Sequence, residues 1–380
     1  MSFEWHQWSL AGFFGALFLI ALSNLWGIPR LRRKAPPDFP KVSILIPMRD
    51  EAGNAKTAIS SVLALDYPDF ELLVYEEGSV DATWEVLKSV SDPRLRVIKG
   101  SAPPPGWTGK NWACHNLANE AKGELLLFVD ADVRLEAQAL RAAVAELLNG
   151  RYHMVSVLPH QEVGSLGELL LVSLIPWSVM SFFPLLLVKA TRIIKIQATV
   201  GQFILVRRDA YEEVGGHKAI KGEVLDDFEL GWRIRGHGFR VGLFYGGDHV
   251  RCRMYRGFRE ALDGLSKNLF LVFRRRLVLF AFVWTFVLYS SWEPLVVSVA
   301  AGLGAPVPAG TFRASLLATS LSLALWEITT LRFGLPLYLP FIHPLVTATA
   351  FATAVRSAYW HLAGRGTWKG RTIHVERRES

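Results

Sequence analysis

Residues 9–27 form an apolar run that carries no charged side chain, and this run constrains the fold more than any other feature of the sequence. It has the length of a helix that crosses the hydrocarbon core of a bilayer, where a helix satisfies its own backbone hydrogen bonds. Trp5 and Trp8 precede the run and Trp26 ends it, a pattern typical of membrane interfaces. A cleaved signal peptide would instead show a shorter apolar run behind a basic segment. The basic cluster at residues 30–34 follows the run, so the positive-inside rule predicts that the chain after it is cytoplasmic.

The composition predicts more membrane segments, because 51% of the residues are hydrophobic and 20% are charged. Residues 277–302 and 314–330 are expected to cross the bilayer. Residues 335–355 are long enough to cross, but prolines crowd their first half, and a crossing would leave the basic tail, residues 356–380, outside the cell. We therefore expect a broken or re-entrant segment there, within a C-terminal membrane region that covers residues 277–355, and a cytoplasmic tail.

Two other segments are expected at the membrane surface. Residues 166–188 are apolar enough to span, yet they lie between acidic motifs that must face the same aqueous site, which excludes a single crossing. They form either an interfacial hairpin or a buried core element. Residues 257–276 carry apolar and basic side chains at helical spacing and are predicted to form an interfacial helix. Ordinary packing against membrane helices would also account for both segments.

Acidic side chains follow an apolar strand in the middle of the chain. Residues 124–129 read as a buried strand, and Asp130 and Asp132 come directly after it. The carboxyl ends of parallel strands are where open α/β sheets bind ligands. Mg²⁺ and Mn²⁺ favour oxygen ligands and are held by one or two carboxylates together with substrate phosphates. The pair therefore predicts a divalent cation that carries a diphosphate, although Asp-x-Asp also occurs in solvated turns.

Further motifs follow in a fixed order along the chain. A strand at residues 41–46 leads into Pro47, Arg49 and Glu51, and a strand at residues 70–75 leads into Glu76 and Glu77. A glycine-rich turn containing Lys110 then precedes a helix, and Asp226 and Asp227 begin another. With the Asp-x-Asp pair, this set resembles the family 2 glycosyltransferases of the GT-A fold, over residues 41–260. The resemblance implies an α/β domain with a Rossmann-like mixed sheet, on the cytoplasmic side, attached to α-helical transmembrane segments.

The resemblance also implies a nucleoside-diphosphate sugar as donor, most often a UDP-sugar. The residues that would contact its base and ribose are Pro47, Arg49, Glu51, Glu76 and Glu77. The family usually has Asp-Asp in place of the two glutamates, which leaves the identity of the nucleotide open. A lysine at a helix N-terminus favours phosphate, so Lys110 is predicted to contact the diphosphate; a plain surface lysine is the alternative.

In the family, the second acid of the later pair is the general base, which predicts Asp227 for that role and Asp226 as its support. Acids in the first turn of a helix can also be simple complements to the helix dipole. Arg253 and Arg256 stand where related membrane enzymes carry Gln/Arg-x-x-Arg-Trp, with Gly257 in place of the tryptophan. In the tail, Trp368 and Arg371 resemble a segment of lipid-linked relatives that could close over the diphosphate. A basic membrane-surface tail is the alternative there.

Together, these expectations predict a membrane-bound, inverting hexosyltransferase that uses Mg²⁺ or Mn²⁺. Its predicted acceptor is a carotenoid, hopanoid or sphingolipid-like compound. A processive polysaccharide synthase, with more spans, and a non-catalytic membrane subunit of the same fold remain alternatives. The net charge of +8 does not indicate nucleic acid, because the basic residues lie beside apolar spans, where anionic lipids are the natural partners. The two cysteines, Cys114 and Cys252, fit a reducing compartment.

Overall fold

The computed structural model describes residues 2–190, 198–364, 367–368 and 371–372. The chain forms two compact units, and each is built from segments that are distant in the sequence. The helical unit comprises Met1–Gly27, Val163–Thr191 and Tyr255–Trp368. Of the described residues, the sheet unit comprises 28–162, 198–254 and 371–372.

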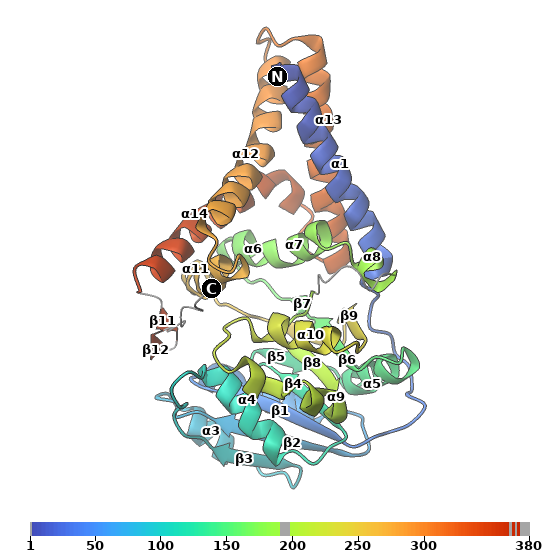
Figure 1. The fold of residues 1–380 in the computed structure, drawn as a ribbon, viewed down its shortest axis with the longest axis vertical. Helices are drawn as coiled ribbons and strands as arrows, with labels where there is room; N and C mark the ends of the chain where they lie inside the picture. Colours follow the sequence, from blue (N-terminus) through green and yellow to red (C-terminus); the bar gives the residue numbers. More distant parts are fainter. Residues whose placement is uncertain (1, 191–197, 365–366, 369–370, 373–380) are drawn as a thin grey trace. The chain divides into compact units, whose positions relative to one another are not determined.

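A seven-stranded mixed sheet forms the centre of the sheet unit, with the order β3-β2-β1-β4-β8-β6-β9 (Figure 1). The strands are β1 Val42–Met48, β2 Phe70–Glu76, β3 Leu95–Lys99, β4 Leu125–Val129, β6 Met154–Leu158, β8 Phe203–Arg207 and β9 Val241–Tyr245. The four strands β3, β2, β1 and β4 are parallel to one another, and β6 is parallel to β9. Strand β8 is inserted antiparallel between β4 and β6. The predicted Rossmann-like mixed sheet is therefore confirmed.

Helices cover both faces of this sheet, which explains why its strands read as continuous apolar runs. The helices are α2 Ala52–Leu63, α3 Thr83–Lys88, α4 Gly109–Glu120, α5 Ala139–Asn149, α9 Arg208–Glu213 and α10 Asp226–Gly236. Alternate residues of β1 belong to different cores: Ile44 packs with residues of α2 and α5, and Leu45 packs with residues of α4 and α10. Both faces of the sheet are thus buried. Residues that bind ligands or act in catalysis must therefore lie in the loops at the strand ends.

A small second sheet lies beside the end of β4. It consists of β5 Val133–Leu135, β10 Val250–Cys252 and β7 His160–Gln161, in the order β5-β10-β7. Strand β5 begins one residue after Asp132, so the pairing of β5 with β10 holds the Asp-x-Asp turn between the two sheets.

The helical unit contains eight helices within the described residues, drawn in Figure 1. They are α1 Phe3–Gly27, α6 Leu166–Val172, α7 Leu174–Phe182, α8 Leu185–Ala190, α11 Phe258–Val272, α12 Leu277–Gly302, α13 Ala309–Phe333 and α14 Leu339–Leu362. Three of these, α1, α12 and α13, are long and apolar enough to cross a membrane. Helix α1 packs along α13, and α12 packs against both α13 and α14. The three candidate spans indicate a membrane protein.

Helix α14 is continuous from Leu339 to Leu362, where the sequence predicted a break. Pro340 lies at the start of the helix, where the missing N–H group costs nothing. Pro344 lies inside it and cannot donate to the carbonyl of Pro340, but His343 Nδ1 lies 2.7 Å from that oxygen. A side chain thus replaces the lost backbone hydrogen bond, so the prolines do not end the helix. Whether α14 crosses the bilayer stays a prediction.

Residues 166–188 form the short helices α6, α7 and α8 of the helical unit rather than one span. Asn24 of α1 satisfies the backbone at the break between α7 and α8. Its Nδ2 donates to the carbonyls of Met180 (2.9 Å) and Phe183 (2.7 Å), and its Oδ1 accepts from the N–H of Leu185 (3.1 Å). Buried backbone groups need such partners, and the apolar chain can therefore turn here without leaving them unpaired.

Candidate active site

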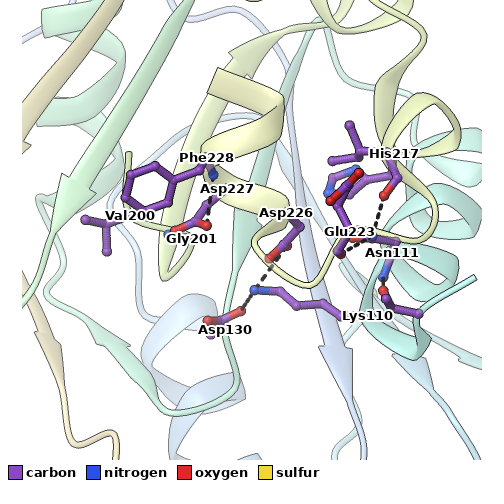
Figure 2. A network of polar contacts seen from close by, with 12 residues as sticks. Lys110, Asn111, Asp130, Val200, Gly201, His217, Glu223, Asp226, Asp227 and Phe228 are labelled. Atoms are coloured by element: carbon purple, nitrogen blue, oxygen red, sulfur yellow. Dashed lines mark hydrogen bonds and ion pairs between the residues drawn. The ribbon is translucent and has the colours of Figure 1, made fainter. Parts of the chain in front are cut away.

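Lys110 joins the two acidic motifs of the sheet unit (Figure 2). Its ammonium nitrogen lies 2.9 Å from Asp130 Oδ1 and 3.3 Å from Asp226 Oδ2. Asp130 follows β4, Asp226 begins α10, and Lys110 lies in the first turn of α4. Burial lowers the pKa of Lys110, but the two carboxylates outweigh this effect and hold the pKa well above its usual value. The lysine therefore stays charged, beside both acids.

The approach of α4 to α10 depends on one buried amide. Thr108 caps α4, because its Oγ1 accepts from the N–H of Asn111 (3.2 Å). The Nδ2 of Asn111 then donates to the carbonyls of Ile220 and Glu223, at 2.8 Å each (Figure 2). These carbonyls belong to the loop that leads into α10. The residue after Lys110 thus fixes the position of Asp226.

Asp227 is held by backbone donors from two directions. Its Oδ2 accepts from the N–H of Gly201 (2.9 Å), and its Oδ1 accepts from the N–H of Phe228 (2.9 Å) (Figure 2). Burial, followed by the charge of Asp226, raises the pKa of Asp227 to about 7, against the opposing effects of Lys110 and the two N–H donors. A carboxyl with this pKa can take up a proton near neutral pH, as a general base must.

A side chain at position 201 would crowd these groups. A Cβ atom built there would lie 3.2 Å from Asp227 Cβ and 3.3 Å from Lys110 Nζ. Lys110 and Asp227 therefore flank the same small space.

Asp132 has the properties of an unsatisfied ligand. Its Oδ1 is buried and has no hydrogen-bond partner among the described residues. Burial, followed by the charges of Asp130 and Glu51, raises the pKa of Asp132 to about 7. A divalent cation would relieve both features, because it supplies the missing partner and favours the charged carboxylate. The described residues include no cluster of three or more His, Cys, Asp or Glu side chains suited to a metal. Asp130 and Asp132 would therefore need further ligands, such as phosphate oxygens of a substrate, to complete the shell of a hard cation.

The two turns that were predicted to hold the nucleoside are interlocked. The N–H of Asp50 donates to Ser79 Oγ (3.0 Å), and the N–H of Val80 donates to Asp50 Oδ1 (2.8 Å). Glu76 and Glu77 are buried, at 2% and 6% exposure, which excludes a solvated turn.

Glu76 Oε1 accepts from the N–H of Ser79, so this carboxylate shapes its own turn. Pro47, in β1, pairs in register with Tyr75 of β2, and Arg49 Nε lies 3.6 Å from Asp50 Oδ2. Glu51 is the N-cap residue of α2. The structure thus brings these residues to one edge of the sheet, next to the acids that follow β4.

Four other residues that were predicted to contact the donor lie in different parts of the chain. Arg253 follows β10 in the sheet unit, and Arg256 belongs to the helical unit. Trp368 and Arg371 lie in the short strands β11 Thr367–Trp368 and β12 Arg371–Thr372, and their side chains, like residues 369–370 between them, lie outside the described part. Their roles stay predictions.

Comparison with known proteins now decides the class of this chain. The family model described as glycosyl transferase family 21 matches residues 10–249. The chain belongs to this family. The predicted glycosyltransferase of GT-A type is therefore confirmed.

One curated relative and one solved structure illustrate what this family 21 member is similar to. The 4,4'-diaponeurosporenoate glycosyltransferase of Staphylococcus aureus (strain USA300) is 27% identical over 233 residues, which cover 60% of each chain. The chain thus spans about 60% of the length of the curated relatives it matches first. The structure of mannosyltransferase PcManGT from Pyrobaculum calidifontis, in complex with GDP-Man and Mn²⁺, has a TM-score of 0.55 and 20% identity. This similarity, over 95% of the chain and 99% of that structure, shows a shared fold.

Several residues of the candidate site were not predicted as such. Asn111, Gly201 and Gln202 position the acids through the contacts of their amide and backbone groups. Asn111 follows Lys110 in the glycine-rich segment. The sequence therefore indicated that it lies near the site, but not that its side chain contacts the loop before α10. Gly201 and Gln202 appear in the sequence merely as the start of an apolar strand.

Proposed function

We propose that this enzyme transfers one hexosyl group from a nucleoside-diphosphate sugar to a hydroxyl or carboxyl group of a membrane lipid, with inversion at the anomeric carbon. Asp227 is the general base, and the observation that carries the assignment is its environment. Asp227 is a partly buried carboxylate with a pKa near 7, next to Lys110, which also contacts Asp130. Asp226 supports it by balancing the charge of Lys110.

Asp130 and Asp132 would hold Mg²⁺ or Mn²⁺. When bound, the cation neutralises charge on the diphosphate that leaves. Lys110 supplies a second positive charge at the same edge, and the N-terminus of α4 adds backbone N–H donors that favour phosphate. The first two turns would hold the nucleoside through Pro47, Arg49, Glu51, Glu76 and Glu77. The Mn²⁺ and GDP-Man of the Pyrobaculum calidifontis structure belong to that protein, and support a cation and a nucleotide sugar here by analogy.

The protein residues then carry the proton. When the acceptor is a hydroxyl group, Asp227 takes its proton as the hydroxyl oxygen attacks the anomeric carbon and the bond to the diphosphate breaks. A carboxyl acceptor is already ionised near neutral pH and attacks without this proton transfer. Gly201 N–H and Phe228 N–H hold the carboxylate in one orientation, so it is ready before the acceptor binds. Direct displacement requires no second carboxylate as nucleophile, and it inverts the anomeric centre.

The lipid acceptor is proposed from the helical unit and from the relative that is named for 4,4'-diaponeurosporenoate. A carotenoid, hopanoid or sphingolipid-like compound has the required apolar body and a terminal hydroxyl or carboxyl group. We place the reaction on the cytoplasmic face, because basic residues follow α1 and precede α12. Three candidate spans among the described residues are fewer than expected for a synthase that translocates a polymer.

The test is an assay on membranes that contain the full chain, with UDP- and GDP-hexoses, followed by mass spectrometry of extracted lipids. We expect a lipid that gains one hexose, with an anomeric configuration opposite to that of the donor. A ladder of hexoses would indicate a polymer synthase. Asp227→Asn should keep the affinity for the donor and lower turnover by about 10²- to 10⁴-fold, because the base acts in the transition state. Turnover within a few-fold of wild type would remove Asp227 from this role.

A further inference from the structure

Cys252 lies next to the Asp-x-Asp turn although it is distant in sequence. Strand β10 pairs antiparallel with β5, and in this register Cys252 is opposite Val133, the residue after Asp132. The side chain is fully buried. None of the motifs that indicate glycosyl transfer includes this cysteine, and the proposed reaction does not use it as a nucleophile.

A chain of hydrogen bonds orients the thiol. Gln161 Nε2 donates to Gln202 Oε1 (2.9 Å), which turns the Gln202 amide so that its Nε2 donates to Cys252 Sγ (2.8 Å). Because the sulfur already accepts a hydrogen bond, its S–H group is free to donate, and the Asp132 carboxyl is the neighbouring acceptor that interacts with it. The backbone carbonyl of Gln202 also accepts from the N–H of Asp130 (3.2 Å). Gln202 therefore contacts both parts of the proposed cation site, directly at Asp130 and through the thiol at Asp132.

The second carboxylate oxygen of Asp132 indicates the role of these hydrogen bonds. Oδ1 is buried without a hydrogen-bond partner among the described residues, although a buried carboxylate oxygen is costly to leave unpaired. A thiol is a weak donor, so it can fix the rotation of the carboxylate while leaving most of its negative charge for another partner.

We propose that Cys252, oriented by Gln202 and Gln161, is a positioning residue that holds the Asp132 carboxylate with Oδ1 directed to a divalent cation. The inference rests on the proposed function, because it assigns the cation to Asp132. Residues that orient metal ligands typically contribute about 10- to 100-fold to metal affinity. The thiol thus has a measurable role without touching the substrate.

The experiment measures Mn²⁺ affinity by the electron paramagnetic resonance signal of free Mn²⁺, with the full-length chain in detergent and saturating UDP or GDP. Cys252→Ala should weaken Mn²⁺ binding by about 10- to 100-fold, while nucleotide affinity without Mn²⁺ stays unchanged. Cys252→Ser keeps a donor and an acceptor in place and should restore Mn²⁺ affinity to within a few-fold of wild type. Cys114→Ala is the matched control, since Cys114 is also buried in the sheet unit, and it should bind Mn²⁺ as wild type does.

Gln161→Met tests the same series of hydrogen bonds at its other end. It also tests the role of Cys252 if Cys252→Ala does not fold. Without the Gln161 donor, the Gln202 amide is no longer held in one orientation, so Mn²⁺ affinity should fall in the same direction. Wild-type affinity in a folded Cys252→Ala, or in Gln161→Met, would overturn the inference. Equal losses in the serine and alanine variants would also overturn it, because the donor would then be irrelevant. If the wild-type chain binds no Mn²⁺ with either nucleotide, the cation assignment fails as well.

Discussion

Lys110 should control the pH at which the enzyme becomes active. Its ammonium is 3.3 Å from Asp226 and shares a small space with Asp227, so its charge lowers the pKa of Asp227 from an even higher value. An opposite charge within about 4–6 Å shifts a carboxyl pKa by about 1–3 units, and partial exposure of Lys110 favours the lower end. Lys110→Met should therefore move the pKa of Asp227 from about 7 to about 8.

The sign of the effect follows from the role of the base. Asp227 acts when it is deprotonated, so activity is lost as the pH falls through its pKa, and a higher pKa moves this loss to higher pH. One pKa unit corresponds to about 1.4 kcal/mol. At pH 6.5, the deprotonated fraction of Asp227 should fall about eightfold in Lys110→Met, relative to the plateau of each variant. Any loss of diphosphate binding lowers the plateau but does not move the midpoint.

The assay is the pH dependence of kcat/KM for the donor, at a saturating concentration of the divalent cation. The cation keeps Asp132 ionised, and this matters because the pKa of Asp132 is also near 7. Lys110→Arg keeps the charge and should keep the wild-type midpoint. The residual activity of Asp227→Asn should show no transition near pH 7. An unchanged midpoint in Lys110→Met would refute the view that Lys110 sets the pKa of the base.

Three further outcomes are expected. Gly201→Ala should lower turnover by about tenfold with little loss of thermal stability, measured by kinetics and a melting curve, because its methyl group would press on Asp227 and Lys110 at 3.2–3.3 Å. Asn24→Leu should lower the stability of the detergent-extracted protein by at least about 2 kcal/mol in a denaturation experiment, since it leaves buried backbone groups unpaired, whereas Ser23→Ala should not. Cysteine labelling should reach Ala363→Cys from the cytoplasmic side, and labelling from outside would show that α14 crosses.

The strands and the acids that follow them could be predicted from the sequence, because buried strands are short apolar runs and their ends are marked by polar residues. The positions of β1, β2 and β4, each with acidic residues after its last apolar residue, follow from this pattern alone. The direction of β8 does not. A strand that is buried on both faces has the same apolar pattern in either direction, so its antiparallel insertion between β4 and β6 is decided by tertiary structure.

The prolines of α14 show where local rules mislead. Pro336, Pro340 and Pro344 are close enough together to indicate a broken helix, and the prediction followed that rule. The helix continues because Pro340 falls at its start and because His343 supplies a donor to the carbonyl that Pro344 leaves unpaired. That compensation depends on the rotamer of one histidine, which no spacing pattern encodes.

Two adjacent residues that no sequence pattern singles out connect the parts of the site. Gly201 N–H holds the proposed base, and the Gln202 carbonyl holds the backbone of Asp130, so the start of β8 connects the proton acceptor to the proposed cation ligands. Because β8 is antiparallel to β4, its first residues lie at the same edge as the last residues of β4. With a parallel strand in that position, Gly201 and Gln202 would lie at the opposite edge, far from Asp130. The antiparallel direction of β8 therefore lets two adjacent residues contact the proposed base and the backbone of a proposed cation ligand.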